Sequence, residues 1–215
     1  MQIKTTLLLT LLVCSCDLAA KESTIQVADF SKNDLSGWES QEFDGITQYT
    51  FDRDQRTTVL KANSHRAASG LVKKIPIDLF KTPYLNWRWK VNNPLFKLNE
   101  AEKAGDDYAA RIYIVIDGGA LFWRTLALNY VWASNKPVNE LWTSPYTNNV
   151  KMIAIDSGET FKKQWRNNKR NVRTDLRKAF GREIRFIDAV AIMTDTDNSL
   201  QKATAYYGDI YFTSD

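Results

Sequence analysis

Cysteine and histidine are scarce in this chain of 215 residues. Both cysteines, Cys14 and Cys16, lie near the N-terminus, and His65 is the single histidine. If the N-terminal segment is removed, the remaining domain has no disulfide and depends on core packing or on a bound metal. Catalytic zinc sites and Ser-His-Asp triads need histidines, so the sequence argues against both classes. Any metal would have to be bound through oxygen atoms.

Apolar runs long enough to cross a membrane are also missing. The run Leu7–Val13 follows a basic residue and is too short to span a bilayer, as is typical of a signal peptide. It ends in the sequence VCSC, and this order of apolar, small, small, Cys resembles the bacterial lipobox. We therefore predict a lipoprotein signal peptide over residues 1–15, lipidation of Cys16, a tether over residues 16–24 and a single domain over residues 25–215.

An ordinary secretory signal, cleaved near Ala20, is the alternative. Both signals predict export to the periplasm of a bacterial cell envelope, and the lipid anchor would be the only membrane contact. The net charge is a modest +4, and the one dense basic stretch is Lys162–Arg185. A solvated helix face explains this stretch better than a nucleic-acid surface does. We expect no nucleic-acid partner and a monomer.

Alternating apolar and polar residues are the strongest structural signal in the chain. In residues 109–116 (AARIYIVI), Ile112 and Ile114 share one strand face, whereas Arg111 lies on the other. Residues 84–91 (YLNWRWKV) and 126–132 (LALNYVW) alternate in the same way and are expected to be neighbouring strands. One amphipathic helix is predicted near residues 171–180. About ten strands and one helix predict an all-β fold, an antiparallel β-sandwich of the jelly-roll type.

A family resemblance rests on motifs spread from Phe30 to Phe212. TPYLNWRWKV, KAGDDYAARIYIVI, LNYVWAS, RNVRTDLRKAFG, VAIMTDTDNS and AYYGDIYF resemble the bacterial envelope family catalogued as domain of unknown function 3047. This resemblance implies an exported bacterial protein and transfers no catalytic residue. More loosely, the opening DF and the closing GDIYF resemble galactose-binding-like β-sandwiches, which include carbohydrate-binding modules. That second resemblance implies a structural Ca²⁺ site at Asp29 and Asp209.

Oxygen-bearing side chains gather in the segment TDTDNS. Asp195, Asp197 and Asn198 lie within four residues at the end of a predicted strand, and a second acid pair, Asp106 and Asp107, lies in a turn. Ca²⁺ takes several oxygen ligands from flexible loops, so a calcium site is one interpretation. Turn-forming Asp and Asn that cap backbone groups are the other. No cofactor is required by the sequence.

The polar faces of the central strands carry Arg88, Arg111 and Asn129. If these strands are neighbours, the cations need compensation, which Asp107 or Asp195 could provide. One interpretation is a polar cleft on a concave face that binds an anionic or hydroxyl-rich ligand. The other is a salt-bridged network beneath a covering loop.

Aromatic side chains in a proline-bounded loop, Trp142 and Tyr146, are candidates for stacking on sugar rings. Packing of that loop onto the sandwich is the alternative. Together these patterns favour a non-catalytic protein that binds a glycan or another polar envelope ligand. Two other functions stay open: a glycan-active hydrolase or lyase with paired carboxylates, and a purely structural envelope lipoprotein.

Overall fold

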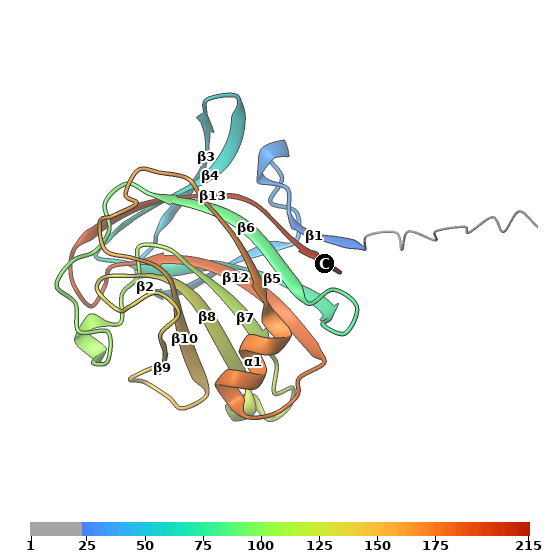
Figure 1. Ribbon diagram of the computed structural model, residues 1–215. Coiled ribbons are helices and arrows are strands. Elements are labelled where there is room, and N and C mark those ends of the chain that lie inside the picture. Colours follow the sequence, from blue (N-terminus) through green and yellow to red (C-terminus); the bar gives the residue numbers. More distant parts are fainter. Residues whose placement is uncertain (1–22) are drawn as a thin grey trace, which may run out of the picture.

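The computed structural model describes residues 23–215, which form two β-sheets packed face to face and a single α-helix (Figure 1). The predicted signal peptide (residues 1–15), the predicted lipidation site Cys16 and most of the predicted tether (residues 16–24) lie outside the described residues. They stay predictions.

One sheet has six strands, and β13 lies at its centre. The strands are β1 (Thr24–Ala28), β3 (Gln48–Asp54), β4 (Thr57–His65), β6 (Tyr84–Val91), β11 (Arg166–Asn171) and β13 (Lys202–Thr213). Their order is β11-β6-β13-β4-β3, with β1 also paired to β13, and every pair is antiparallel. We call this the β13 sheet.

The other sheet has seven strands. They are β2 (Trp38–Asp44), β5 (Ala68–Asp78), β7 (Arg111–Ile116), β8 (Leu126–Ala133), β9 (Leu141–Thr143), β10 (Val150–Ser157) and β12 (Phe186–Asp195). Their order is β2-β5-β12-β7-β8-β10-β9. Only β8 and β10 pair in parallel in this sheet, because the segment after β8 folds into β9 at the sheet edge before β10 returns. We call this the β12 sheet; the predicted all-β sandwich is confirmed.

Aromatic side chains from both sheets meet in the core. Trp87 and Trp89 of β6 are buried, as the alternation predicts, and they pack against Tyr130 and Trp132 of β8. The ring centroids of Trp87 and Tyr130 are 5.4 Å apart, and those of Trp89 and Trp132 are 6.3 Å apart. The two strands therefore face one another across the sandwich. The expectation that β6 lies beside β7 and β8 in one sheet is wrong, since an apolar face can be buried from either side of a core.

The amphipathic helix is present as α1 (Val172–Phe180). The side chain of Asn171 caps its first turn by accepting a hydrogen bond from the Thr174 amide, 3.0 Å away. Gly181 ends the helix with φ 68°, a left-handed conformation that glycine adopts without strain. Val172 and Leu176 are buried in the core, which confirms the predicted helix. The basic stretch Lys162–Arg185, expected to be a helix face, contains the edge strand β11 as well as α1.

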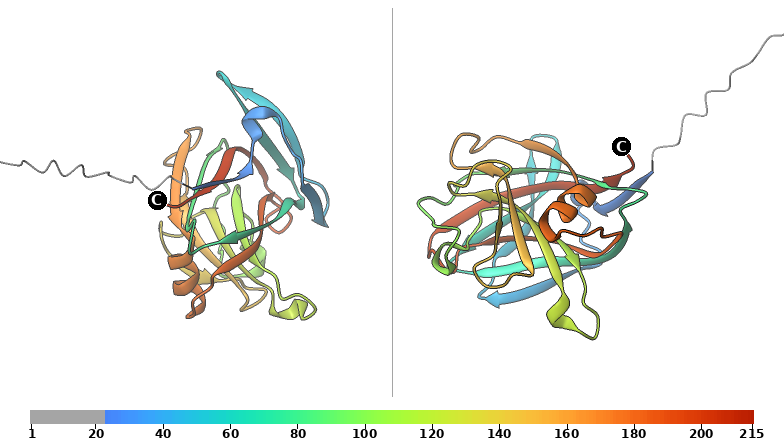
Figure 2. Two further views of the ribbon diagram at one scale, coloured as in Figure 1. Left: turned by 90° about the vertical axis from the view of Figure 1, so that its right-hand side faces the viewer. Right: turned by 60° about the horizontal axis from the view of Figure 1, so that its bottom comes forward.

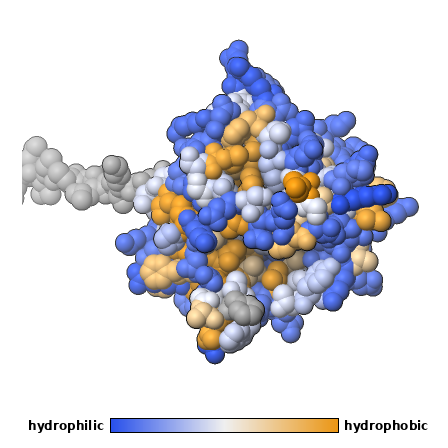
Figure 3. Space-filling model, turned by 180° about the vertical axis from the view of Figure 1, so that it is seen from behind, coloured by the Kyte–Doolittle hydropathy of each residue, from blue (hydrophilic) through white to orange (hydrophobic). Residues whose placement is uncertain are grey.

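Three short 3-10 turns complete the described chain: η1 (Phe30–Lys32), η2 (Lys103–Gly105) and η3 (Phe122–Arg124). The predicted loop over residues 134–147 contains the three-residue strand β9. Two further views show that the described chain begins and ends at the same side of the sandwich (Figure 2). Within residues 23–215, no helix is long and apolar enough to cross a membrane. The face seen in Figure 3 is largely hydrophilic, with apolar side chains gathered in its middle.

Candidate functional site

The candidate site lies on the outer face of the β12 sheet, at one end of β7 and β12. Arg111 and Tyr113 of β7 point away from the core because Ile112 and Ile114 are buried in it. The register places Met193 of β12 opposite Arg111, and Asn129 of β8 opposite Tyr113. These four side chains, three of them polar and one a methionine, therefore share one face of the adjacent strands β12, β7 and β8.

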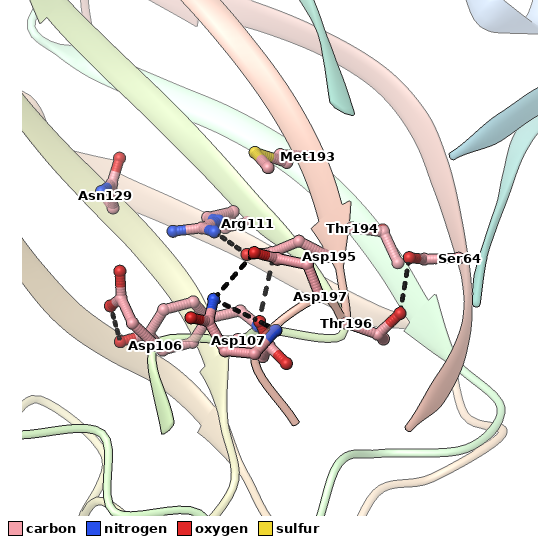
Figure 4. A network of polar contacts seen from close by, with 12 residues as sticks. Ser64, Asp106, Asp107, Arg111, Asn129, Met193, Thr194, Asp195, Thr196 and Asp197 are labelled. Atoms are coloured by element: carbon pink, nitrogen blue, oxygen red, sulfur yellow. Dashed lines mark hydrogen bonds and ion pairs between the residues drawn. The ribbon is translucent and has the colours of Figure 1, made fainter. Parts of the chain in front are cut away.

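Arg111 and Asp195 form a buried ion pair (Figure 4). Arg111 is 5% exposed and Asp195 is 1% exposed. The predicted pairing of Arg111 with a nearby acid is confirmed. Asp195 also accepts a hydrogen bond from the Tyr108 amide at 3.2 Å. The guanidinium lies between two rings, 4.8 Å from the centroid of Tyr108 and 5.2 Å from that of Tyr113.

Burial dominates the electrostatics of this pair. It raises the pKa of Asp195 well above its usual value, and the charge of Arg111 opposes that shift. Burial also works against the charge of Arg111, but the neighbouring Asp195 carboxylate keeps its pKa above the usual value. The guanidinium thus stays charged, and it is the positive centre of an otherwise acidic site.

Three further carboxylates surround the pair. Burial raises the pKa of Asp106 and of Asp197. Asp107 is held as a hydrogen-bond acceptor by the amides of Asn198 and Ser199, at 3.2 and 2.6 Å. These bonds fasten the loop after β12 to the turn before β7. Acids that are far apart in the sequence therefore meet at one end of the sheet.

A pocket of about 430 Å³ opens beside this network. Arg111, Asn129, Met152 and Met193 are buried at its base, and the exposed side chains of Phe43 and Tyr146 lie at its margin. The other lining residues are Asp44, Ala68, Asp106, Tyr113, Ser144, Thr147, Val150, Asp195, Asp197 and Asn198. We call this cavity the Arg111 pocket.

Three buried polar atoms of residues that line the Arg111 pocket have no hydrogen-bond partner among residues 23–215. They are the side-chain oxygen of Asn129, Nε of Arg111 and one carboxylate oxygen of Asp197. The amide nitrogen of Asn129 reaches only the sulfur of Met152, at 3.6 Å. Buried polar groups are normally satisfied, so an unpaired acceptor and an unpaired donor at the base of one pocket call for a partner from outside the chain.

The two predicted aromatic residues have different positions. Tyr146 is 53% exposed, and its hydroxyl donates a 2.9 Å hydrogen bond to the Asn198 side chain across the Arg111 pocket. Trp142 does not line that pocket. It packs 6.4 Å from the ring of Tyr108 in a small second core on the outer face of the β12 sheet. The packing alternative thus describes Trp142, and the platform alternative remains for Tyr146.

Arg88 is not part of this site. It lies on β6 in the β13 sheet, and its guanidinium stacks 4.7 Å above the ring of Trp165. Gly208 leaves room for its side chain, since a Cβ atom at Gly208 would lie 2.5 Å from Cγ of Arg88. The prediction that places Arg88 beside Arg111 is wrong, because β6 belongs to the opposite sheet.

The predicted calcium ligands are divided between two places. Asp209 accepts two hydrogen bonds from Ser31, at 2.8 and 2.6 Å, and Asp29 pairs with Lys32 at 3.0 Å. Within residues 23–215, the one group of three acids that could hold a metal is formed by Asp107, Asp195 and Asp197, whose ligand atoms lie within 4.8 Å of one another.

The donors of that group do not fit Ca²⁺ in this arrangement. Both oxygens of Asp107 and both of Asp195 accept hydrogen bonds from protein donors. Asn198 turns its nitrogen to the acids and its oxygen to Tyr146. The unpaired oxygen that remains is one of Asp197. A cation that needs several free oxygens would have to displace this network; calcium binding stays a prediction.

Several lining residues were not predicted from the sequence. Tyr113 and Met193 each lie two residues from a predicted site residue on the same strand, so strand alternation contained the signal for both. Phe43 reaches the Arg111 pocket from the edge strand β2, and no sequence pattern indicates that approach.

A family model places the sequence. The family described as Protein of unknown function (DUF3047) matches residues 36–211. The chain belongs to that family. The match covers the whole β12 sheet and the β13 sheet except β1 and the last two residues of β13, and it confirms the family resemblance seen in the motifs. No curated protein matches the sequence.

Solved structures with a similar fold include carbohydrate-binding and carbohydrate-cleaving domains. The family 11 carbohydrate-binding module of cellulase Lic26A-Cel5E from Clostridium thermocellum is 9% identical, with a TM-score of 0.46, over 88% of this chain and 94% of that one. An engineered Cel12A cellulase derived from Rhodothermus marinus is 10% identical, with a TM-score of 0.49, over 89% and 100%. The xyloglucanase domain of NopAA from Sinorhizobium fredii is 9% identical, with a TM-score of 0.46, over 91% and 99%. At these TM-scores the likenesses do not indicate a ligand for this chain.

Proposed function

We propose that this protein is an exported, non-catalytic binding protein of the bacterial cell envelope, and that its Arg111 pocket receives a neutral, hydroxyl-rich ligand such as a glycan end. The observation that carries the proposal is the pair of unsatisfied polar atoms, on Asn129 and Arg111, at the base of that pocket. Sugar hydroxyls both donate and accept hydrogen bonds, so one ligand could satisfy both atoms.

The shape of the pocket supports a small ligand. Its volume of about 430 Å³ lies in the ordinary range for small-molecule sites. Tyr113, Tyr146 and Phe43 offer ring faces, and such faces stack on the apolar sides of sugar rings. The ion pair itself is too deeply buried to provide most of the contact, so binding would depend on the pocket beside it.

Charge distinguishes between classes of glycan. Four aspartates, Asp106, Asp107, Asp195 and Asp197, surround a single guanidinium, and Arg88 does not join them. Arg111 is the one basic residue that lines the pocket, and it is already paired with Asp195, so the pocket offers no free cation to an acidic glycan, which the sequence alone left open. A neutral saccharide needs no such cation.

Substitution of Tyr146 tests the proposal, since its exposed side chain can be removed without opening the core. The purified chain is screened against neutral and acidic glycans, and hits are measured by calorimetry. We expect neutral hits only, with Tyr146→Ala weakening Kd by about tenfold. Phe96→Ala is the matched control, because Phe96 is also exposed but does not line the pocket. The same samples are assayed for new reducing ends, which would indicate a hydrolase.

The absence of any glycan hit, together with no thermal shift from any polysaccharide, would favour a structural envelope protein instead. In that case the Arg111–Asp195 pair would only hold the loop after β12 in place. Hits confined to acidic glycans would contradict the charge argument while keeping the pocket as a binding site.

Export and anchoring belong to the same proposal, supported by the lipobox-like sequence before Cys16. Labelled fatty acid should be incorporated into the wild-type chain and not into Cys16→Ala, and the variant should leave the membrane fraction. If the wild type is not labelled, the lipobox interpretation is wrong, and the alternative of an ordinary secretory signal cleaved near Ala20 is favoured.

A further inference from the structure

Two aromatic side chains are left exposed at the end of the sandwich opposite the Arg111 pocket. Phe80, in the turn after β5, is 49% exposed, and Phe186, the first residue of β12, is 50% exposed. The Arg185 guanidinium lies 5.3 Å from the ring of Phe80 and 4.9 Å from that of Phe186. Arg173 lies 4.2 Å from the ring of Phe80. These four side chains form one surface, which we call the Phe80 patch.

The surroundings of the Phe80 patch are basic. Asp78 and Glu183 pair with Arg185 and Arg173, at 2.9 and 2.6 Å. A third acid, Asp188, is exposed on β12 two residues after Phe186. The cations that lie near in sequence or in electrostatic reach of Glu183 outnumber these three acids; they are Lys81, Arg173, Arg177, Arg182 and Arg185. A positive surplus therefore surrounds two exposed rings.

The Phe80 patch lies where the described chain begins. Thr24 pairs with Thr213, and Thr213 pairs with Tyr84, four residues after Phe80. The amide of Leu79, next to Phe80, donates to the carbonyl of Arg185 at 2.8 Å. Figure 1 shows the same arrangement: the start of β1, the C-terminus and the turn before β6 lie on the right-hand side of the molecule. The left view in Figure 2 has this side facing the viewer. A chain anchored through its N-terminus would turn this side to the membrane.

The Arg111 pocket lies at the far end. Phe186 begins β12 and Asp195 ends it. At about 3.3 Å per residue, the two ends of this strand are about 30 Å apart. Contact of the Phe80 patch with a surface would thus leave the pocket open to solvent.

We propose that the Phe80 patch is a membrane-docking surface for anionic lipid headgroups. Aromatic side chains are favoured at the boundary between headgroups and acyl chains. Arginine offers forked donors to phosphate, and each cation near an anionic leaflet adds to the attraction. Phe80 and Phe186 suit the boundary between headgroups and acyl chains, and Arg173 and Arg185 suit the lipid phosphates. The orientation follows from the anchoring proposed above, but the docking surface itself does not depend on lipidation or on ligand binding.

A fluorophore placed on the Phe80 patch tests this proposal directly. The full-length chain carries Cys14→Ser and Cys16→Ser, which removes both native thiols and the lipid, and then Phe80→Cys for labelling with an environment-sensitive dye. Phe96→Cys is the matched control, because Phe96 is 59% exposed and follows the opposite end of β6. Vesicles contain phosphatidylcholine alone or phosphatidylglycerol and phosphatidylcholine in equal parts.

We expect the dye at position 80 to shift its emission to the blue with the anionic vesicles, and the dye at position 96 to show no shift. High salt should reverse the effect. In flotation with the unlabelled thiol-free chain, Phe80→Ser with Phe186→Ser should lower the partition coefficient by about fivefold or more, and Phe96→Ser should not. Equal shifts at both positions, or a shift with phosphatidylcholine alone, would overturn the proposal. Vesicle binding through residues 1–22 would also bring position 80 closer to the membrane than position 96. The flotation of Phe80→Ser with Phe186→Ser, which leaves residues 1–22 unchanged, is therefore the comparison that assigns binding to the Phe80 patch, and an unchanged partition coefficient in that variant would overturn the proposal.

Discussion

Replacement of Arg111 by Met has the largest effect that we expect from a single substitution. Among residues 23–215, Arg111 is the one cation paired with Asp195, and the change removes it. Asp195, which is 1% exposed, would then keep a single hydrogen bond, from the Tyr108 amide. It also removes the cation from between the rings of Tyr108 and Tyr113. Breaking a buried ion pair from one side costs about 3–5 kcal/mol, because an uncompensated carboxylate remains.

Equilibrium unfolding in urea, followed by tryptophan fluorescence, measures this cost. The midpoint should fall while the m-value stays constant, and the melting temperature should drop by about 6–20 °C. Adding Asp195→Asn to Arg111→Met should restore part of the lost stability, because no buried charge is then left behind. A loss below about 1 kcal/mol for Arg111→Met, or no recovery in the double variant, would refute the buried-pair reasoning.

The remaining predictions concern pH, a second buried network, a helix cap and calcium. Burial raises the pKa of Asp106 in the folded state above its value in the unfolded state. The stability that protonated Asp106 contributes is therefore full below the unfolded-state pKa and is lost as pH rises through the folded-state pKa. Asp106→Asn should reduce the fall in the urea midpoint between acidic and alkaline pH. Asp156→Ala should cost about 2–4 kcal/mol in urea unfolding, because it leaves the buried Trp89 indole N–H, now 2.8 Å from the carboxylate, without an acceptor. Asn171→Ala should cost about 1 kcal/mol through loss of the helix cap, and Asn167→Ala, at an exposed position of β11, is the neutral control. Calcium should raise the melting temperature little, because most carboxylate oxygens of the acid cluster already accept hydrogen bonds; a large shift that chelator reverses would show that the network opens to bind it.

Local patterns in the sequence determined the elements and their faces. Ile112 and Ile114 had to be buried, and this requirement turned Arg111 outward, because a one-residue slip in register would reverse every side chain. The helix near residues 171–180 followed from its apolar period and from Gly181. The acid that pairs with Arg111 was also predictable, since Asp195 ends an apolar strand that had to lie at the centre of a sheet.

Some strands gave no such signal. β11, with the sequence RNNKRN, is an edge strand that pairs with β6 through its backbone and has almost no apolar face, so neither alternation nor apolar content marks it. The strand β2 is similarly polar and exposed. An edge strand is held by backbone hydrogen bonds to the sheet that it joins. Its side chains need not be buried on either face, so the apolar pattern that identifies a central strand in the sequence is missing.

Only the tertiary structure decided which strands share a sheet. The alternation in β6 and in β8 is the same, yet Trp87 and Tyr130 meet from opposite sides of the core. That choice moved Arg88 away from Arg111 and changed a basic face into an acidic pocket. It also brought Phe80, Phe186 and the start of the chain to one end of the sandwich, through a register that joins residues far apart in sequence. Alternation fixes the buried side of each strand locally, whereas sheet membership depends on long-range pairing and packing of the whole core.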